Sequence, residues 1–240
     1  MKRIGFFPAV LAVGTIGLFA QTSPQDIVAR LEKELRSLTN FQADFSQTSS
    51  STTVSAPLQQ TGKIYFKKPD LMRWEYGPPE RSTYFYKEGL YLSYFPEDKQ
   101  LWKQKISAEE YETGILGILV GKARLAEKYI IESSPFPGGE KGSAQLKLTP
   151  REEGNNEYIL LEIDQKIWML RRAVLFDWAG NKIEYGFSRI KKNANLADDL
   201  FEIKVPPDCE IIEDAGPRKK STHSAPRALQ SSFAKQMRAG

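Results

Sequence analysis

A long series of short, strand-like segments constrains the fold of this chain more than any other feature. Apolar and aromatic residues are concentrated in short runs, from GKIYF at 62–66 to LFEIKVPP at 200–207. Turn sequences separate these runs, among them FPEDKQ at 95–100 and WAGN at 178–181. About ten such segments predict a meandering antiparallel sheet.

A helix is expected before the strands. In SPQDIVARLEKELRSL at 23–38, Ser23 suits the N-cap and Pro24 suits the first turn. Apolar residues then recur every three or four positions, with charged residues between them. This pattern predicts a helix over 24–38.

A second helical region lies between the two halves of the strand series, at 107–128. Ser107 and Glu110 form a capping-box pattern, which predicts the start of a helix. The apolar stretch 114–120 contains two glycines, and each costs about 1 kcal/mol relative to alanine inside a helix. We therefore expect helix at both ends of this region and a loosely held middle.

The stretch FKKPDLMRWEY at 66–76 reads as a strand that Pro69 interrupts. Proline removes a hydrogen bond of the strand ladder, so central strands exclude it, whereas an edge or bent strand tolerates it. The sequence therefore predicts a bent edge strand at the rim of the sheet, with large apolar side chains on both sides of the bend.

The two termini differ from the body of the chain. Lys2 and Arg3 precede an apolar run that ends at Ala20, which is typical of a secretory signal peptide; a membrane anchor is the alternative. The end of the chain is rich in Pro, Ser, Lys and Arg, which indicates disorder, with a basic amphipathic helix as the alternative. The expected parts are a signal peptide at 1–20, a folded domain at 21–214 and a disordered basic tail at 215–240.

The net charge of +4 is distributed unevenly along the chain. Six basic residues and no acidic ones lie in 217–240, and two more basic residues lie in the expected signal peptide. The remaining body has a net charge of −4. This balance argues against a nucleic-acid-binding domain.

The residues that catalysis and metal binding usually require are scarce. The only histidine, His223, lies in the expected tail, and the only cysteine, Cys209, has no partner for a disulfide. No dinucleotide-binding or phosphate-binding glycine motif is present. We therefore expect no catalytic residues, no metal site and no cofactor, and we expect a protein that is not an enzyme.

Several strand-like segments have large apolar residues on both alternating sets of positions. In LYLSYF at 90–95, Leu90 and Leu92 alternate with Tyr91, and YILLEI at 158–163 follows the same pattern. Either the sheet is buried on both faces, or it curves into an incomplete barrel whose concave side holds an apolar ligand. Two helical regions are few for covering such a sheet, which favours the incomplete barrel.

These features together resemble the LolA family of periplasmic outer-membrane lipoprotein carriers. The resemblance runs from about 24 to 214, and its most specific motifs are FQADFSQ at 41–47, GKIYFKKPDLMRWEY at 62–76, the prolines at 78–79, EGLYLSYFPEDKQ at 88–100, TGILGIL at 113–119 and LFEIKVPPDCEII at 200–212.

The resemblance implies a fold and a function. The fold is mainly β with helices (α+β): an incomplete antiparallel β-barrel of about ten or eleven strands, with an α-helical lid over an apolar cavity. The function is that of a monomeric periplasmic carrier, without nucleic acid or cofactor. It binds the acyl chains of lipoproteins as cargo, receives them from an inner-membrane lipoprotein-releasing transporter and delivers them to an outer-membrane receptor.

The resemblance also indicates which residues form the site. We expect the lid to present Ile115, Leu116, Ile118 and Leu119. Lys68 stands where the family has an arginine that holds the lid closed, and lysine lacks the planar fork of arginine, so a weaker latch is expected. The cavity wall is expected to contain Phe45, Ile64, Phe66, Leu71, Met72, Trp74, Leu90, Leu92, Leu161 and Ile163.

Three other functions stay open at this stage. The same fold could serve an exported sensor or carrier of another lipid or glycolipid. A hydrolase that uses carboxylates would need a site that the sequence does not show. An integral outer-membrane barrel would need sustained apolar–polar alternation, which this chain lacks.

Overall fold

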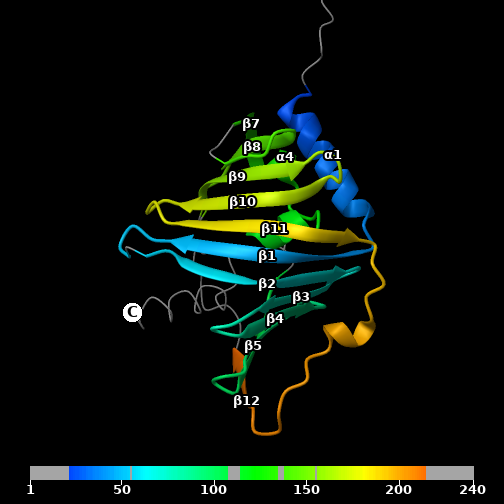
Figure 1. Cartoon of the computed structure of the whole chain (residues 1–240), viewed down its shortest axis with the longest axis vertical. Helices are drawn as coiled ribbons and strands as arrows, with labels where there is room; N and C mark the ends of the chain where they lie inside the picture. The colour runs from blue at the N-terminus through cyan, green and yellow to red at the C-terminus, as the bar shows by residue number, and fades with distance from the viewer. Residues whose placement is uncertain (1–21, 55, 108–113, 135–137, 155, 215–240) are drawn as a thin grey trace, which may run out of the picture.

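The computed structural model describes residues 22–54, 56–107, 114–134, 138–154 and 156–214. Within these ranges the strands form one sheet of twelve, in the order β12-β6-β5-β4-β3-β2-β1-β11-β10-β9-β8-β7. Figure 1 shows this sheet as a curved stack, with β7 at the top and β12 at the bottom. The two edge strands do not pair with each other, so the sheet is an open, incomplete barrel.

All neighbouring strands are antiparallel except β12 and β6, which are parallel. The strands are β1 (Asn40–Ser50), β2 (Leu58–Lys67), β3 (Leu71–Tyr76), β4 (Ser82–Lys87), β5 (Leu90–Phe95), β6 (Gln100–Lys105), β7 (Tyr129–Ser133), β8 (Ser143–Pro150), β9 (Asn156–Asp164), β10 (Met169–Asp177), β11 (Lys182–Lys192) and β12 (Glu210–Asp214).

Helices occur on one side of this sheet and in the connections. They are α1 (Pro24–Ser37), α3 (Gly114–Leu119), α4 (Leu125–Lys128) and the short 3-10 helix η1 (Asp198–Phe201). The predicted first helix is confirmed, and the Ser23 side chain accepts a hydrogen bond from the Asp26 N–H at its start. None of the helices in the described ranges has the length and apolar character that crossing a bilayer requires.

The register of the strands defines two faces, because successive side chains alternate between them. We call the face that carries Phe45, Ile64 and Trp74 the inner face; Ile64 pairs with Trp74, and Trp74 pairs with Tyr84. The main hydrophobic core consists of this face together with α1, α3 and the residues around α4. The opposite face is called the outer face.

Pro69 does not lie in an edge strand, so that prediction was wrong. β2 ends at Lys67 and β3 begins at Leu71, and both strands lie in the middle of the sheet. Residues 68–70 form the turn between them. A turn needs no ladder donor at the proline, which is why the sheet tolerates it there.

The stretch 114–119 is a helix whose six residues are all buried, whereas the sequence predicted a loosely held middle. Tertiary burial outweighs the cost of its two glycines, since helix propensity is a weak effect beside packing. The predicted helix start at Ser107 and Glu110 falls mostly in 108–113, which lies outside the described residues.

The region 200–207, predicted as the last strand, instead continues η1 as an extended segment. It belongs to a strap, residues 193–209, that crosses the outer face: the Lys67 Nζ donates to Leu196 O, and Arg73 donates to Leu200 O at 2.8 Å. Strands β7 and β12 were not predicted, so the sheet has twelve strands in place of ten or eleven.

The strap shows that this part of the sheet packs on both faces. Phe85 and Leu101 lie on the outer face and are almost fully buried, although neither belongs to the main core. Leu196 and Phe201 of the strap are buried outside the main core as well. Both explanations of the two-sided apolar pattern therefore hold, each in a different part of the molecule.

Candidate functional site

Seven of the ten residues predicted for the cavity lie together on the inner face. They come from β1, β2, β3 and β9, strands that are far apart in the sequence but that curve around one interior. Each is at most 3% exposed, so they form a continuous buried surface. The seven are Phe45, Ile64, Phe66, Met72, Trp74, Leu161 and Ile163.

The other three predicted cavity residues lie on the outer face, so their assignment was wrong. Leu71 pairs with Lys67, while its neighbour Met72 pairs with Phe66 on the inner face. Leu90 and Leu92 alternate with Tyr91, and Tyr91 is the inner-face residue because it pairs with Tyr86. A one-residue change of register exchanges the two faces, and composition cannot distinguish them when both are apolar.

All four predicted lid residues are buried against the interior. Ile115, Leu116, Ile118 and Leu119 of α3 belong to the same core as the inner face. In Figure 1 the green lid segment lies behind β11 and β1. The structure is therefore a closed form, in which α3 covers the interior.

Beneath the lid only a small void remains, with a volume of about 10 Å³. This volume is on the order of one water molecule, so an acyl chain can enter only if the lid and some aromatic side chains move. Sequence reasoning did not identify the aromatic residues of β4 and β5 that line it. The void is lined by Met72, Trp74, Tyr84, Phe85, Tyr86, Tyr91 and Leu116.

Lys68, the predicted latch, contacts α1. Its Nζ donates a hydrogen bond to the Arg36 carbonyl oxygen in the last turn of that helix. A cation at a helix C-terminus is favourable, because the carbonyl groups there have no partner within the helix. Lys68 therefore connects the turn between β2 and β3 to α1.

The same turn also holds the lid segment, through residues that the sequence did not single out. The Lys122 ammonium, just after α3, forms an ion pair with the Asp70 carboxylate. Glu32 of α1 accepts a hydrogen bond from the Leu125 N–H at 2.6 Å. Gly121 lies so close to Leu35 that a Cβ built on it would be 2.9 Å from the Leu35 Cβ. The turn, α1 and the lid segment therefore form one connected cover.

Replacing Asp70 with asparagine is expected to loosen the lid segment without unfolding the domain. The change removes the carboxylate that Lys122 contacts. Both side chains are about one third exposed, so we expect the free energy of unfolding to fall by at most about 1 kcal/mol. Hydrogen exchange of the backbone amides at 114–122 should become faster, while exchange in β9 should stay unchanged.

Asp208→Asn is the matched control for this experiment. It also removes a carboxylate from an ion pair, here with Lys99 just before β6, and both of these side chains are more exposed. Equal exchange at 114–122 in the two variants would show that Asp70 does not hold the lid segment.

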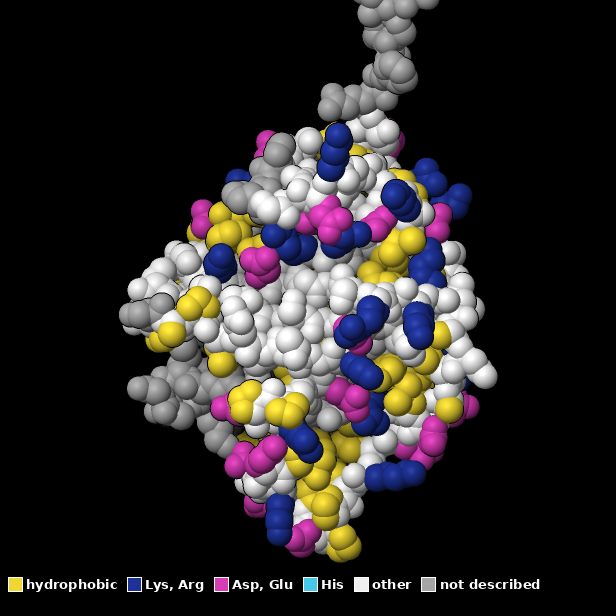
Figure 2. Space-filling model, viewed as in Figure 1, with side chains coloured by type: hydrophobic (Ala, Val, Ile, Leu, Met, Phe, Trp, Pro, Cys, Tyr) yellow, Lys and Arg dark blue, Asp and Glu magenta, His cyan; other side chains and the backbone are white. Residues whose placement is uncertain are grey.

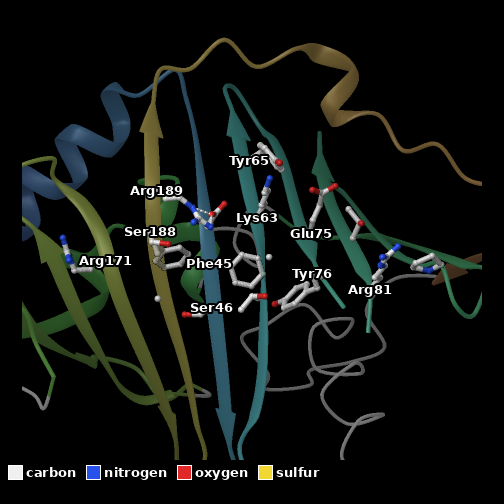
Figure 3. A pocket seen from close by; sticks show the side chains of 18 of the residues that line it. Phe45, Ser46, Lys63, Tyr65, Glu75, Tyr76, Arg81, Arg171, Ser188 and Arg189 are labelled. Atoms are coloured by element: carbon white, nitrogen blue, oxygen red, sulfur yellow. Dashed lines mark hydrogen bonds and ion pairs between the residues drawn. The ribbon is translucent and has the colours of Figure 1, made fainter. Parts of the chain in front are cut away.

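The largest hollow is on the outer face and is not the predicted cavity. Its volume is about 940 Å³, and Figure 3 shows side chains of β1, β2, β3 and β11 around it. Its charges are mixed: Asp44 forms an ion pair with Arg189, and Glu140 with Arg171. Figure 2 shows charged side chains of both signs around a central area of small and polar residues. An open, mixed-charge surface of this kind does not shield an apolar ligand from water.

Groups that could perform catalysis or bind a metal are missing from the described ranges. No set of three His, Cys, Asp or Glu side chains there is arranged to hold a metal ion. Cys209 is partly exposed, and its closest polar contact is the Glu210 carbonyl oxygen at 3.7 Å. His223 lies outside the described residues. The geometry of the described part is therefore that of a binding site.

An open antiparallel sheet with an apolar inner face beneath a helical lid defines a class of proteins that shield apolar ligands. Residues 36–204 match the family described as outer membrane lipoprotein carrier protein LolA. Because this match covers more than half of the sequence, the chain belongs to that family.

Similar proteins agree with this assignment. An outer-membrane lipoprotein carrier protein of Xanthomonas axonopodis pv. citri (strain 306) is 24% identical over 204 residues, which cover 85% of this chain and 96% of the relative. A protein of the same name from Nitrosomonas europaea is 24% identical over 196 residues, which cover 80% and 93%. An uncharacterized conserved protein of Thermus thermophilus has a similar fold, with a TM-score of 0.52, 17% identity and coverage of 79% and 98%.

Proposed function

We propose that this protein carries acylated lipoproteins through the periplasm, with their acyl chains held in the interior beneath α3. The observation that carries the proposal is the continuous inner face of buried apolar residues, which a separate short helix covers. Membership of the lipoprotein-carrier family supports the same conclusion. The protein would act by binding, without catalysis and without a cofactor.

Loading begins with movement of the lid, because the closed interior leaves almost no free volume. The ion pair between Lys122 and Asp70 and the contacts of α1 with the lid segment must break or shift for this. Each methylene that leaves water contributes about 0.8 kcal/mol, so a few acyl chains offset the loss of these contacts. Met72 suits such an adaptable wall, because its side chain is unbranched and flexible.

The proposed route needs partners at both ends. We propose that an inner-membrane lipoprotein-releasing transporter supplies the acylated cargo and that an outer-membrane receptor takes it, with the carrier acting as a monomer. Residues 1–20 would direct export and then be removed, 21–214 would form the carrier domain, and 215–240 would be a basic tail.

Native mass spectrometry tests the proposal. The chain from Gln21 to Gly240 is mixed with a triacylated lipopeptide and, separately, with the same peptide without its acyl chains. We expect a 1:1 complex with the acylated peptide only, because the interior contributes apolar surface and no site for a free peptide. Carbon-13 labelled acyl methyl groups should then show contacts with the α3 side chains by NMR.

Two results would contradict the proposal. Absence of a complex with the acylated peptide, from protein whose circular dichroism is that of a folded β protein, would mean that the interior is a sealed core. Equal binding of both peptides would place the ligand on the surface, with the outer hollow as the first region to examine.

A further inference from the structure

The inner face has no charged residue on the six consecutive strands β1 to β6. The register fixes which residues share this face, beginning with the pairs Phe45–Gly62, Ile64–Trp74 and Trp74–Tyr84. On these strands the inner-face set is Phe41, Ala43, Phe45, Gln47, Ser49, Leu58, Gln60, Gly62, Ile64, Phe66, Met72, Trp74, Tyr76, Ser82, Tyr84, Tyr86, Tyr91, Ser93, Phe95, Gln100, Trp102 and Gln104.

The polarity of this face changes along the strands. Near the turn at 68–70 the inner-face residues of β1, β2 and β3 are Phe41, Phe66 and Met72. Toward the other end of the same strands, polar but uncharged side chains replace them. There the Tyr76 hydroxyl donates to Gln47 Oε1 at 2.6 Å, and Gln47 Nε2 donates to Ser49 Oγ at 3.1 Å.

Buried tyrosines continue this polar end across the sheet. The Tyr76 and Tyr84 rings lie 5.7 Å apart, and the Tyr84 and Tyr91 rings lie 6.1 Å apart. Burial raises the pKa of Tyr76 and of Tyr91 well above the ordinary value, with neighbouring tyrosines as a smaller cause. These hydroxyl groups therefore stay protonated at neutral pH and can donate hydrogen bonds, but they cannot neutralise an anion.

Trp74 lies at the boundary between the apolar and polar ends. It pairs with Ile64 on one side and Tyr84 on the other, and its ring is 5.6 Å from that of Tyr185. Its indole Nε1 is buried and has no hydrogen-bond partner among the residues that the structure describes. A buried N–H without a partner is unfavourable, so an acceptor oxygen beside it would be stabilised.

We propose that the interior selects amphiphiles whose head group is uncharged and joined to the acyl chains by ester or amide bonds. The acyl chains lie against the apolar end and the lid, and carbonyl oxygens accept hydrogen bonds from Trp74 Nε1 and from the tyrosine hydroxyl groups. The lipid part of an acylated, diacylglycerol-modified cysteine has this chemistry. This inference rests on the proposed function, since it requires that the lid opens to admit acyl chains.

The same interior excludes phospholipids. A phosphate placed at the polar end would lose its hydration and meet no Lys or Arg on the inner face of β1 to β6. Neutral hydroxyl and amide groups replace only part of that hydration, so a buried phosphate is strongly unfavourable. A carrier that works between two phospholipid bilayers needs this discrimination, because phospholipid would otherwise compete with its cargo.

The test uses two lipids that differ only in a phosphate: diacylglycerol and phosphatidic acid with identical acyl chains. Each competes, by native mass spectrometry, with a triacylated lipopeptide for the chain from Gln21 to Gly240. We expect diacylglycerol to bind at least about tenfold more tightly than phosphatidic acid. Equal binding, or a preference for phosphatidic acid, would overturn the inference and leave the proposed carrier function intact.

Two variants test the assigned donors. Trp74→Phe removes the indole N–H, and Tyr76→Phe removes a hydroxyl; each is expected to weaken diacylglycerol binding by about threefold to tenfold. Tyr65→Phe is the matched control, because Tyr65 lies on the outer face, paired with Arg73. Unchanged diacylglycerol affinity in both inner-face variants would overturn the assignment. Failure of every acylated ligand to bind the wild-type protein would contradict the proposed function itself.

Discussion

The variant Met72→Asp is expected to lose the complex with acylated lipopeptide entirely. Met72 is 3% exposed, lies on the inner face and lines the small void together with Leu116 of the lid. A carboxylate there has no cation beside it on the inner face, and burial of an unpaired charge costs several kcal/mol. The lid would stay displaced, and the wall that contacts the acyl chains would become charged. Native mass spectrometry with the triacylated lipopeptide measures the loss.

Leu71→Asp is the matched control, one position earlier in the same strand. Leu71 lies on the outer face opposite Lys67, so the new carboxylate stays near solvent and near a cation. We expect this variant to retain the complex. Met72→Gln, which is similar in volume and uncharged, separates an effect of charge on binding from a failure to fold. Equal binding by the two aspartate variants would contradict the assignment of the inner face.

A second large effect is expected at Gly62, where β2 and β3 approach each other closely. A Cβ built on Gly62 would overlap the Glu75 carbonyl oxygen and lie 2.7 Å from the Phe45 ring. The obstructing atom is backbone, so it cannot rotate away. We expect Gly62→Ala to lower the free energy of unfolding by about 3 kcal/mol or more, which corresponds to a decrease in Tm of about 6–12 °C.

Gly77→Ala is the control for this second prediction. Gly77 follows β3, and the nearest atom to its built Cβ is the Thr61 carbonyl oxygen at 3.5 Å, an ordinary contact. Its free energy of unfolding should change by less than about 0.5 kcal/mol. Thermal unfolding followed by circular dichroism compares the two variants. Similar Tm values would show that the strands separate at Gly62 without cost.

Local patterns in the sequence were sufficient for the first helix and for most strands. Ser23 and Pro24 place the start of α1, and the turns at 95–100 and 178–181 separate strands that the structure contains. These signals depend on neighbouring residues alone, so they can be read without knowledge of the fold. The same signals failed at Pro69, because a turn in the middle of a sheet and a bend at its rim use the same residues.

The lid shows a different limit of sequence reasoning. Its glycines predicted a loose segment, yet α3 is a buried helix, because contacts with the inner face outweigh its low helix propensity. The ion pair between Lys122 and Asp70 joins residues 52 positions apart, and no local pattern indicates such a contact.

The sequence by itself determined the fold class, the family and seven of the residues on the inner face. Only the tertiary structure decided which apolar residues face the interior, because Leu71 and Met72 are equally apolar and the register alone sends them to opposite faces. The absence of charge along the inner face of β1 to β6 likewise depends on how six strands align. Strand register is set by cooperative pairing across the whole sheet, and a linear sequence does not display it.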